Sequence, residues 1–120
     1  MDILRFQLPY PPTINHYYKR TTKGLALSTK GIQYRHDAFY LLHKYRNHCK
    51  DKRLCVTINL FPPDKRRRDI DNVLKCLLDS IQHAGVYEDD NQIDMLTIIR
   101  GHIVKDGSVA VWISECSSSK

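Results

Sequence analysis

Hydrophobic and polar residues alternate in some segments of the chain and repeat with helical spacing in others. Alternation predicts strands over residues 3–8, 54–61, 93–104 and 109–113, and a further short strand over residues 25–27. Helical spacing predicts one helix from Ser28 or Thr29 to about Lys50, and a second from near Ile70 to a stop at Ala84–Gly85. This order indicates an α+β fold, a two-layer sandwich of a mixed sheet and two main helices.

The apolar positions also predict which helix faces are buried. In the first helix they are Ile32, Phe39, Leu42 and Tyr45; in the second they are Ile70, Val73, Leu74, Leu77, Leu78 and Ile81. Pro9 ends the first strand, and residues 13–22 are expected to form a loop.

Length and composition favour a single cytoplasmic domain. The 120 residues suffice for one domain, assigned to residues 1–116, with residues 117–120 expected to be a disordered tail. The chain lacks a run of about 18 apolar residues and a signal peptide, so a membrane location is not expected. The four cysteines lack zinc-site spacing and are interpreted as reduced structural thiols. The net charge of +6 favours a polyanionic partner.

One octet combines a run of cations with paired carboxylates. Lys65, Arg66, Arg67 and Arg68 run directly into Asp69-Ile70-Asp71-Asn72 at the expected start of the second helix. Cations bind a polyanion, and paired carboxylates bind a divalent metal. The presence of cations and paired carboxylates in one segment indicates a metal-dependent phosphodiesterase acting on nucleic acid. A solvated basic turn before an aspartate N-cap explains the octet alone equally well.

Further charged residues follow at helical spacing and in a later loop. Asp71, Lys75 and Asp79 are spaced i, i+4, i+8, which places them on one flank of the apolar stripe. An ion pair between Asp71 and Lys75 would also explain the first two, and Asp79 is interpreted as structural or as a support for the metal-binding residues. The segment Glu88–Asn91 supplies more carboxylates, but as an isolated pattern it is a solvated acidic turn. Bringing Asp90 near Asp69 would require a particular fold detail or a second subunit.

Taken together, these motifs resemble the RusA family of Holliday junction resolvases. The likeness lies in Arg67–Asn72, Lys75, Asp79, Ala84–Gly85 and Asp89–Ile93, and in the opening segment Leu8–Tyr18. It covers most of the chain, while His16 and residues 19–24 differ from what other members carry.

The resemblance implies an enzyme with a defined catalytic set. It implies that Asp69, Asp71 and Asp90 hold Mg²⁺, for which Mn²⁺ can substitute, and that Lys75 is a supporting catalytic cation. It also implies a homodimer of bacterial or phage origin that cuts a four-way DNA junction by paired symmetric nicks during recombination and repair.

A second group of residues is expected to bind DNA. Besides the run Lys65 to Arg68, it comprises Asn15, Tyr17, Tyr18, Lys19, Arg20 and Lys23. The two tyrosines either stack on unpaired bases or pack at the base of the loop. The alternatives are a flap- or fork-specific metal nuclease and a non-catalytic junction-binding module.

Overall fold

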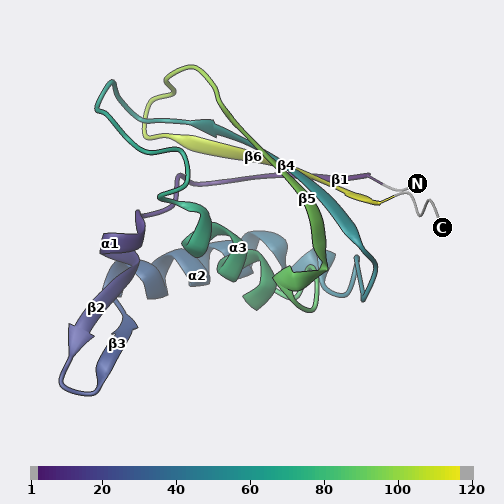
Figure 1. Cartoon of the computed structure of the whole chain (residues 1–120), viewed down its shortest axis with the longest axis horizontal. Coiled ribbons are helices and arrows are strands. Elements are labelled where there is room, and N and C mark those ends of the chain that lie inside the picture. The colour runs from purple at the N-terminus through teal and green to yellow at the C-terminus, as the bar shows by residue number, and fades with distance from the viewer. Residues whose placement is uncertain (1–2, 117–120) are drawn as a thin grey trace.

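A computed structural model describes residues 3–116, in which four strands form one mixed sheet and two more form a hairpin (Figure 1). The elements are β1 (Ile3–Leu8), α1 (Ile14–Tyr17), β2 (Tyr18–Thr21), β3 (Gly24–Leu27), α2 (Thr29–Leu42), the 3₁₀ helix η1 (His43–Tyr45), β4 (Leu54–Phe61), α3 (Leu74–His83), the 3₁₀ helix η2 (Asp90–Gln92), β5 (Ile93–Arg100) and β6 (Ser108–Glu115). The sheet order is β1-β6-β4-β5; β4 and β5 are parallel and the other neighbours antiparallel. The predicted α+β fold with a mixed sheet is therefore confirmed.

The core lies between the sheet and helices α2 and α3, which run along the same face of it (Figure 1). Burial alternates along β4 and β6, so that one face of each strand is fully covered. The buried side chains of these two strands are Leu54, Val56, Ile58, Leu60, Val109, Val111 and Ile113. Helix α3 contributes Cys76, Leu77 and Ile81, each of them 0% exposed.

Helix α2 begins as predicted but ends earlier. The Ser28 hydroxyl caps its first turn. The predicted end near Lys50 is wrong, because the helix stops at Leu42 and η1 follows it. Beyond η1, Asn47 adopts a φ of 60°, and its N–H donates to the carbonyl of Gly85 instead of continuing a helix.

The buried face of α2 also differs from the predicted one. Ile32 and Phe39 are 48% and 41% exposed, whereas Leu42 is buried as predicted, together with Gly31, Tyr34 and Ala38. A side chain on Gly31 would place its Cβ 2.5 Å from the carbonyl oxygen of Tyr17. Glycine thus allows α1 to approach α2 closely, and this approach turns the Gly31 face inward.

Helix α3 starts at Leu74, four residues after the predicted start at Ile70. Residues 70–73 form turns, in which the N–H of Leu74 bonds the carbonyl of Asp71. The carbonyl of Asn72 accepts from the N–H of Ile14 at 2.8 Å, so this carbonyl is used to attach α1 rather than to extend the helix. Ile70 is consequently 36% exposed and does not belong to the buried stripe.

The segment 13–22, expected to be a loop, contains α1 and β2. Strands β2 and β3 pair in an antiparallel hairpin that projects away from the large sheet (Figure 1). The short strand predicted over residues 25–27 is confirmed as β3. The strand predicted over residues 93–104 ends at Arg100, after which Gly101 still bonds the carbonyl of Leu60 at 2.7 Å.

The cysteines correct the expectation of four reduced thiols. Cys55 of β4 and Cys116 form a disulfide with a Cα–Cα distance of 5.4 Å, and Cys49 and Cys76 are free and buried. Within the described residues, none of the helices is long and apolar enough to cross a membrane. The expected tail, residues 117–120, lies outside the described part of the chain.

Candidate functional site

The basic run lies in a turn that directly follows β4 and is held by an aspartate absent from the predicted site. The Asp64 carboxylate accepts hydrogen bonds from Arg68 Nη1 at 2.8 Å and from the Arg66 N–H at 2.9 Å. These two bonds lower the pKa of Asp64 to about 2. The arginines are therefore arranged around an ionised carboxylate at neutral pH.

Arg68 is the most confined residue of this run. Its side chain is 18% exposed, and its guanidinium also bonds the carbonyls of Asp64 and Arg66 and lies 6.0 Å from the ring centroid of Tyr10. Arg100 Nη2, at the end of β5, donates to the Arg68 carbonyl at 2.6 Å. Arg68 thus ties the basic turn to the edge of the sheet.

Asp69 and Asp71 follow in the turn before α3, and both are exposed. The N–H of Asn72 bonds the carbonyl of Asp69 at 3.2 Å, which keeps the segment tightly turned. Since Asp71 precedes the helix, it does not continue the predicted line of Asp71, Lys75 and Asp79 along the helix flank. The aspartates are attached to α1 through Asn72 and to the basic turn through Arg68.

Lys75 and Asp79 belong to a polar network that reaches across to α1 and α2. Asp79 Oδ1 lies 3.5 Å from Lys75 Nζ, and its Oδ2 accepts from the Tyr17 hydroxyl at 3.3 Å. Arg35 Nε donates to the same hydroxyl at 3.0 Å, and Arg35 Nη2 lies 3.9 Å from Asp79 Oδ2. The Asp79 side chain is 16% exposed and that of Lys75 is 50% exposed, so the carboxylate binds the ammonium on its buried side and leaves its other side open to solvent.

The acidic segment 88–91 is a structured turn, in which Glu88, Asp89 and Asn91 are exposed, as predicted, and Asp90 is partly buried. Asp89 and Gln92 form a reciprocal capping box around η2, and the Asp90 N–H donates to the Gln82 side chain at 3.0 Å. Burial raises the pKa of Asp90, and the neighbouring carboxylates of Asp89 and Asp79 raise it further, against an opposing effect of Lys75.

The three predicted metal-binding carboxylates do not form one cluster within a single chain. Across residues 3–116, no three His, Cys, Asp or Glu side chains are grouped so that they could hold one metal ion. Asp90 lies just before the start of β5, whereas Asp69 follows Arg68, which is bonded at the end of the same strand. The structure brings Asp90 together with Asp79 and Lys75, but not with Asp69 and Asp71.

The hairpin β2–β3 presents a second basic surface. Lys19, Arg20 and Lys23 are all exposed, as is Asn15 on α1. Tyr17 is 0% exposed, which supports the packing interpretation rather than base stacking, and Tyr18 is half-buried with its ring edge-on to Tyr17 at 4.8 Å.

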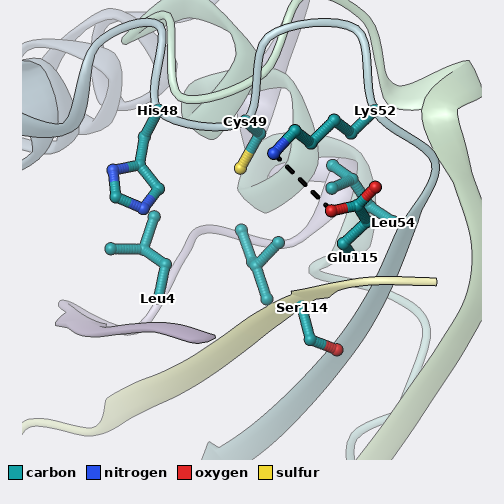
Figure 2. Close-up of a pocket in the computed structure, with 8 residues that line it drawn as sticks. Leu4, His48, Cys49, Lys52, Leu54, Ser114 and Glu115 are labelled. Atoms are coloured by element: carbon teal, nitrogen blue, oxygen red, sulfur yellow. Dashed lines mark ion pairs between the residues drawn. The ribbon is translucent and has the colours of Figure 1, made fainter. Parts of the chain in front are cut away.

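A separate pocket lies between the starts of β1 and β4 and the end of β6 (Figure 2). Its cavity of about 30 Å³ has room for roughly one water molecule. Its rim carries the ion pair of Lys52 and Glu115 at 3.5 Å, and burial raises the pKa of the Cys49 thiol. None of the predicted site residues lines this pocket.

Several supporting residues were not predicted: Arg35, Asp64, Gln82, Gln92 and Arg100. Of these, Gln92 was accessible from the sequence, because an aspartate followed three residues later by glutamine is a capping-box pattern. The others act through contacts between distant segments, for which the sequence offers no local signal.

Comparison with known proteins assigns a family to this arrangement. The model of the family described as endodeoxyribonuclease RusA matches residues 9–114. A crossover junction endodeoxyribonuclease of Enterobacteria phage HK97 is 41% identical over 119 residues, covering 98% of this chain and 99% of the phage protein. Crossover junction endodeoxyribonucleases of Shigella sonnei and of Escherichia coli K12 are each 29% identical, covering 96% of this chain and 97% of theirs.

Proposed function

Because the chain belongs to the RusA family of endodeoxyribonucleases, we propose that it hydrolyses phosphodiester bonds in four-way (Holliday) DNA junctions. The observation that carries the proposal is the continuity of the basic turn with Asp69 and Asp71 in a chain that aligns with its phage relative from end to end. Cations next to carboxylates would bind a phosphate beside the groups that promote its hydrolysis. The phage and bacterial relatives also support action in the bacterial cytoplasm.

Two basic surfaces would bind the DNA backbone. The turn Lys65–Arg68 would contact phosphates next to the cut, and the hairpin residues Lys19, Arg20 and Lys23 would contact a neighbouring arm. Each neutralised phosphate releases counterions, so we expect affinity to fall steeply with salt. Asn15 and Tyr18, at the base of the hairpin, would contact the strand between these surfaces.

The residues suit Mg²⁺ in their chemistry, although one chain supplies only part of a three-carboxylate set. Mg²⁺ commonly binds one or two carboxylates together with water and substrate phosphate, and the exposed Asp69 and Asp71 are hard oxygen donors of this kind. Asp90 is crowded by Asp79 and Asp89, and a nearby cation would relieve that repulsion. When bound, Mg²⁺ would neutralise charge on the phosphate and make a water molecule more acidic; Mn²⁺ would substitute.

Lys75 would be the catalytic cation of the chain itself. Its half-exposed ammonium is held by the Asp79 carboxylate at 3.5 Å, which leaves further N–H groups able to reach a phosphate oxygen. Donation to that oxygen would stabilise the charge that develops as the phosphodiester is attacked. Asp79 acts through Lys75 and is a positioning residue.

We further infer that the active form is a homodimer. Asp90 is not grouped with Asp69 and Asp71 in one chain, and a second chain would supply the missing carboxylate to each site. A two-fold pair also suits a junction with near two-fold symmetry, in which two sites nick two opposed strands.

The experiment that tests the proposal compares Asp71→Asn with Asp106→Asn on an immobile four-way junction, a flap and a linear duplex, each with Mg²⁺ or EDTA. Asp106 is an exposed aspartate in the β5–β6 connection, and its φ of 66° suits asparagine. We expect paired nicks in the junction alone, loss of at least about a hundredfold in rate for Asp71→Asn, and no loss for the control.

The outcomes separate the proposal from its alternatives. Junction binding should persist in Asp71→Asn, because removing a negative charge does not weaken phosphate contacts. Cleavage of flaps in preference to junctions would indicate a flap or fork nuclease. Tight junction binding with no cut by the parent chain in either Mg²⁺ or Mn²⁺ would leave a binding module.

A further inference from the structure

A second pocket lies between the segment that joins β1 to α1 and the first half of α2. Its volume is about 360 Å³, compared with about 30 Å³ for the pocket of Figure 2. Pockets for small molecules usually measure about 300–1,000 Å³, so this one lies at the lower end of that range. Two of the residues that line it, Pro11 and Tyr34, are buried. The pocket therefore has room for one small planar group on a fixed apolar floor.

Two rings line the pocket, and each is held by a neighbouring residue. The Nδ1 atom of His16 lies 3.2 Å from the hydroxyl oxygen of Thr13. The Tyr10 ring has the Arg68 guanidinium 6.0 Å from its centroid, and a Cβ on Gly107 would lie 2.6 Å from the Cβ of Tyr10. Rings that are already confined lose little freedom when a flat ligand stacks on them.

The polar groups of the pocket are mainly hydrogen-bond acceptors. On α2, Gln33 Nε2 donates to Asp37 Oδ1 at 2.9 Å, and both side chains line the pocket. A carboxylate and an amide carbonyl can each accept several hydrogen bonds, so acceptor capacity remains on both residues. The Tyr34 hydroxyl, in contrast, already donates to the carbonyl of Pro9 at 2.6 Å. Lys30 supplies an exposed cation.

The charges of the pocket favour a neutral ligand. Lys30 and Asp37 carry opposite formal charges, so a phosphate that entered the pocket would meet a carboxylate as well as an ammonium. The adjacent basic turn has the charge that a phosphate requires, and Tyr10 contacts Arg68 of that turn. A nucleotide with its phosphate at Arg68 would consequently have its base beside Tyr10.

We propose that this pocket binds one unpaired nucleobase of the DNA strand held by the basic turn. The base would stack on Tyr10 and His16, and its exocyclic amino group would donate to Asp37 and Gln33. Enzymes that take a base out of the stack hold it by aromatic or apolar contacts and by hydrogen bonds to its edge, and this pocket offers both. Lys30 would contact the phosphate of the same nucleotide.

The acceptors of the pocket predict which bases it takes. Adenine, cytosine and guanine carry an exocyclic amino group, whereas thymine carries carbonyl oxygens and no amino group. A carbonyl oxygen placed against the Asp37 carboxylate would bring two acceptors together without a proton between them. Thymine should therefore bind less tightly than the other three bases.

The inference rests on the proposed function but is tested without cleavage, by equilibrium binding to immobile four-way junctions in EDTA. The junctions differ at one nucleotide beside the crossover, which is adenine, cytosine, guanine, thymine or an abasic site. At one such position the parent chain should bind the amino-bearing bases at least about fivefold more tightly than the abasic site, as expected for one stacked base. This ratio should be the same at two salt concentrations, because base contacts release no counterions.

Three variants of α2 assign the preference to the pocket. Asp37→Asn keeps the shape of the side chain but supplies an amide that can also donate, and Gln33→Ala removes the carbonyl acceptor. Each should bind junctions with thymine about as tightly as those with an amino-bearing base. Tyr40→Ala, at a position that is 77% exposed and outside the pocket, should keep the preference of the parent.

The outcomes separate this inference from the proposed function. Equal affinity of the parent for all five junctions would overturn the base pocket, and so would a preference that both Asp37→Asn and Gln33→Ala retain. A parent that binds no junction would overturn the proposed function together with the pocket. Junction cleavage in Mg²⁺, measured separately, would establish nuclease activity whichever base preference is found.

Discussion

Replacing Tyr17 with phenylalanine removes one oxygen from the centre of the network that holds Lys75. The hydroxyl donates to Asp79 and accepts from Arg35, while the ring is 0% exposed. Phenylalanine fills the same space, so the change leaves no cavity and isolates the two hydrogen bonds. We expect Tyr17→Phe to destabilise the fold.

The magnitude follows from the two contacts. Hydrogen bonds to charged groups contribute about 1.5–3 kcal/mol each when well shielded. Here the side chains of Arg35 and Asp79 are 28% and 16% exposed, and their direct contact at 3.9 Å remains, so water and that contact offset part of the loss. A net decrease of about 1–2 kcal/mol in the free energy of unfolding is expected.

Urea unfolding measures this decrease. With a slope typical of a small domain, the midpoint should fall by roughly 0.5–1 M. Tyr40→Phe on the exposed side of α2 is the control and should leave the midpoint unchanged. Because burial raises the pKa of Tyr17 to about 12, the hydroxyl stays protonated, and the difference should be constant from neutral pH to about pH 10.

A double-mutant cycle with Asp79→Asn assigns the effect. If Tyr17 stabilises the fold through Asp79, the two variants together should cost about 1 kcal/mol less than the sum of the single changes. Equal midpoints for Tyr17→Phe and Tyr40→Phe, or strict additivity in the cycle, would refute the network as the support of Lys75.

Three further outcomes are expected. Gly31→Ala should lower the free energy of unfolding by about 1–2 kcal/mol, because its Cβ meets the Tyr17 carbonyl at 2.5 Å and the strain exceeds the gain in helix propensity; chemical denaturation checks this. Gln92→Leu should cost about 3 kcal/mol or more in thermal unfolding, since this buried side chain makes four hydrogen bonds to backbone groups, which leucine leaves unpaired. The folded pKa of Asp64, about 2, lies below its unfolded value of 3.8, so its contribution to the free energy of unfolding is present above pH 3.8 and is lost as the pH falls through 2. Unfolding curves of the parent and of Asp64→Asn should therefore differ at pH 7 and converge near pH 2.

The sequence predicted the parts of the fold that depend on local patterns. Alternation located β4 residue by residue, and Ser28 marked the start of α2, because strand alternation and helix capping are properties of short segments. The start of α3 was predicted too early, since the carbonyl of Asn72 is used by Ile14, which is distant in the chain. No local rule anticipates such a bond.

The residues of the candidate site likewise fall into those that a local pattern predicted and those that it did not. The basic run and Asp69 and Asp71 are contiguous, so spacing alone was enough to find them. Asp64 and Arg100, which hold that run in place, are recognised only through contacts that form on folding. In the proposed homodimer, Asp90 would join the other carboxylates through a second chain, and a single-chain pattern carries no information on that point.

The cations of the basic turn differ in conformational entropy, because Arg68 is confined and Arg66 is not. Arg66 is 82% exposed, whereas Arg68 is fixed by a carboxylate, two carbonyls and an aromatic ring before any DNA arrives. Immobilising a long side chain on binding costs about 0.5–1.5 kcal/mol of conformational entropy. Arg68 has already lost this freedom on folding, so it loses little more on binding. A phosphate approaching the turn would be attracted by the exposed cations and then positioned by the confined Arg68, so its orientation beside Asp69 would be set with little further loss of side-chain freedom.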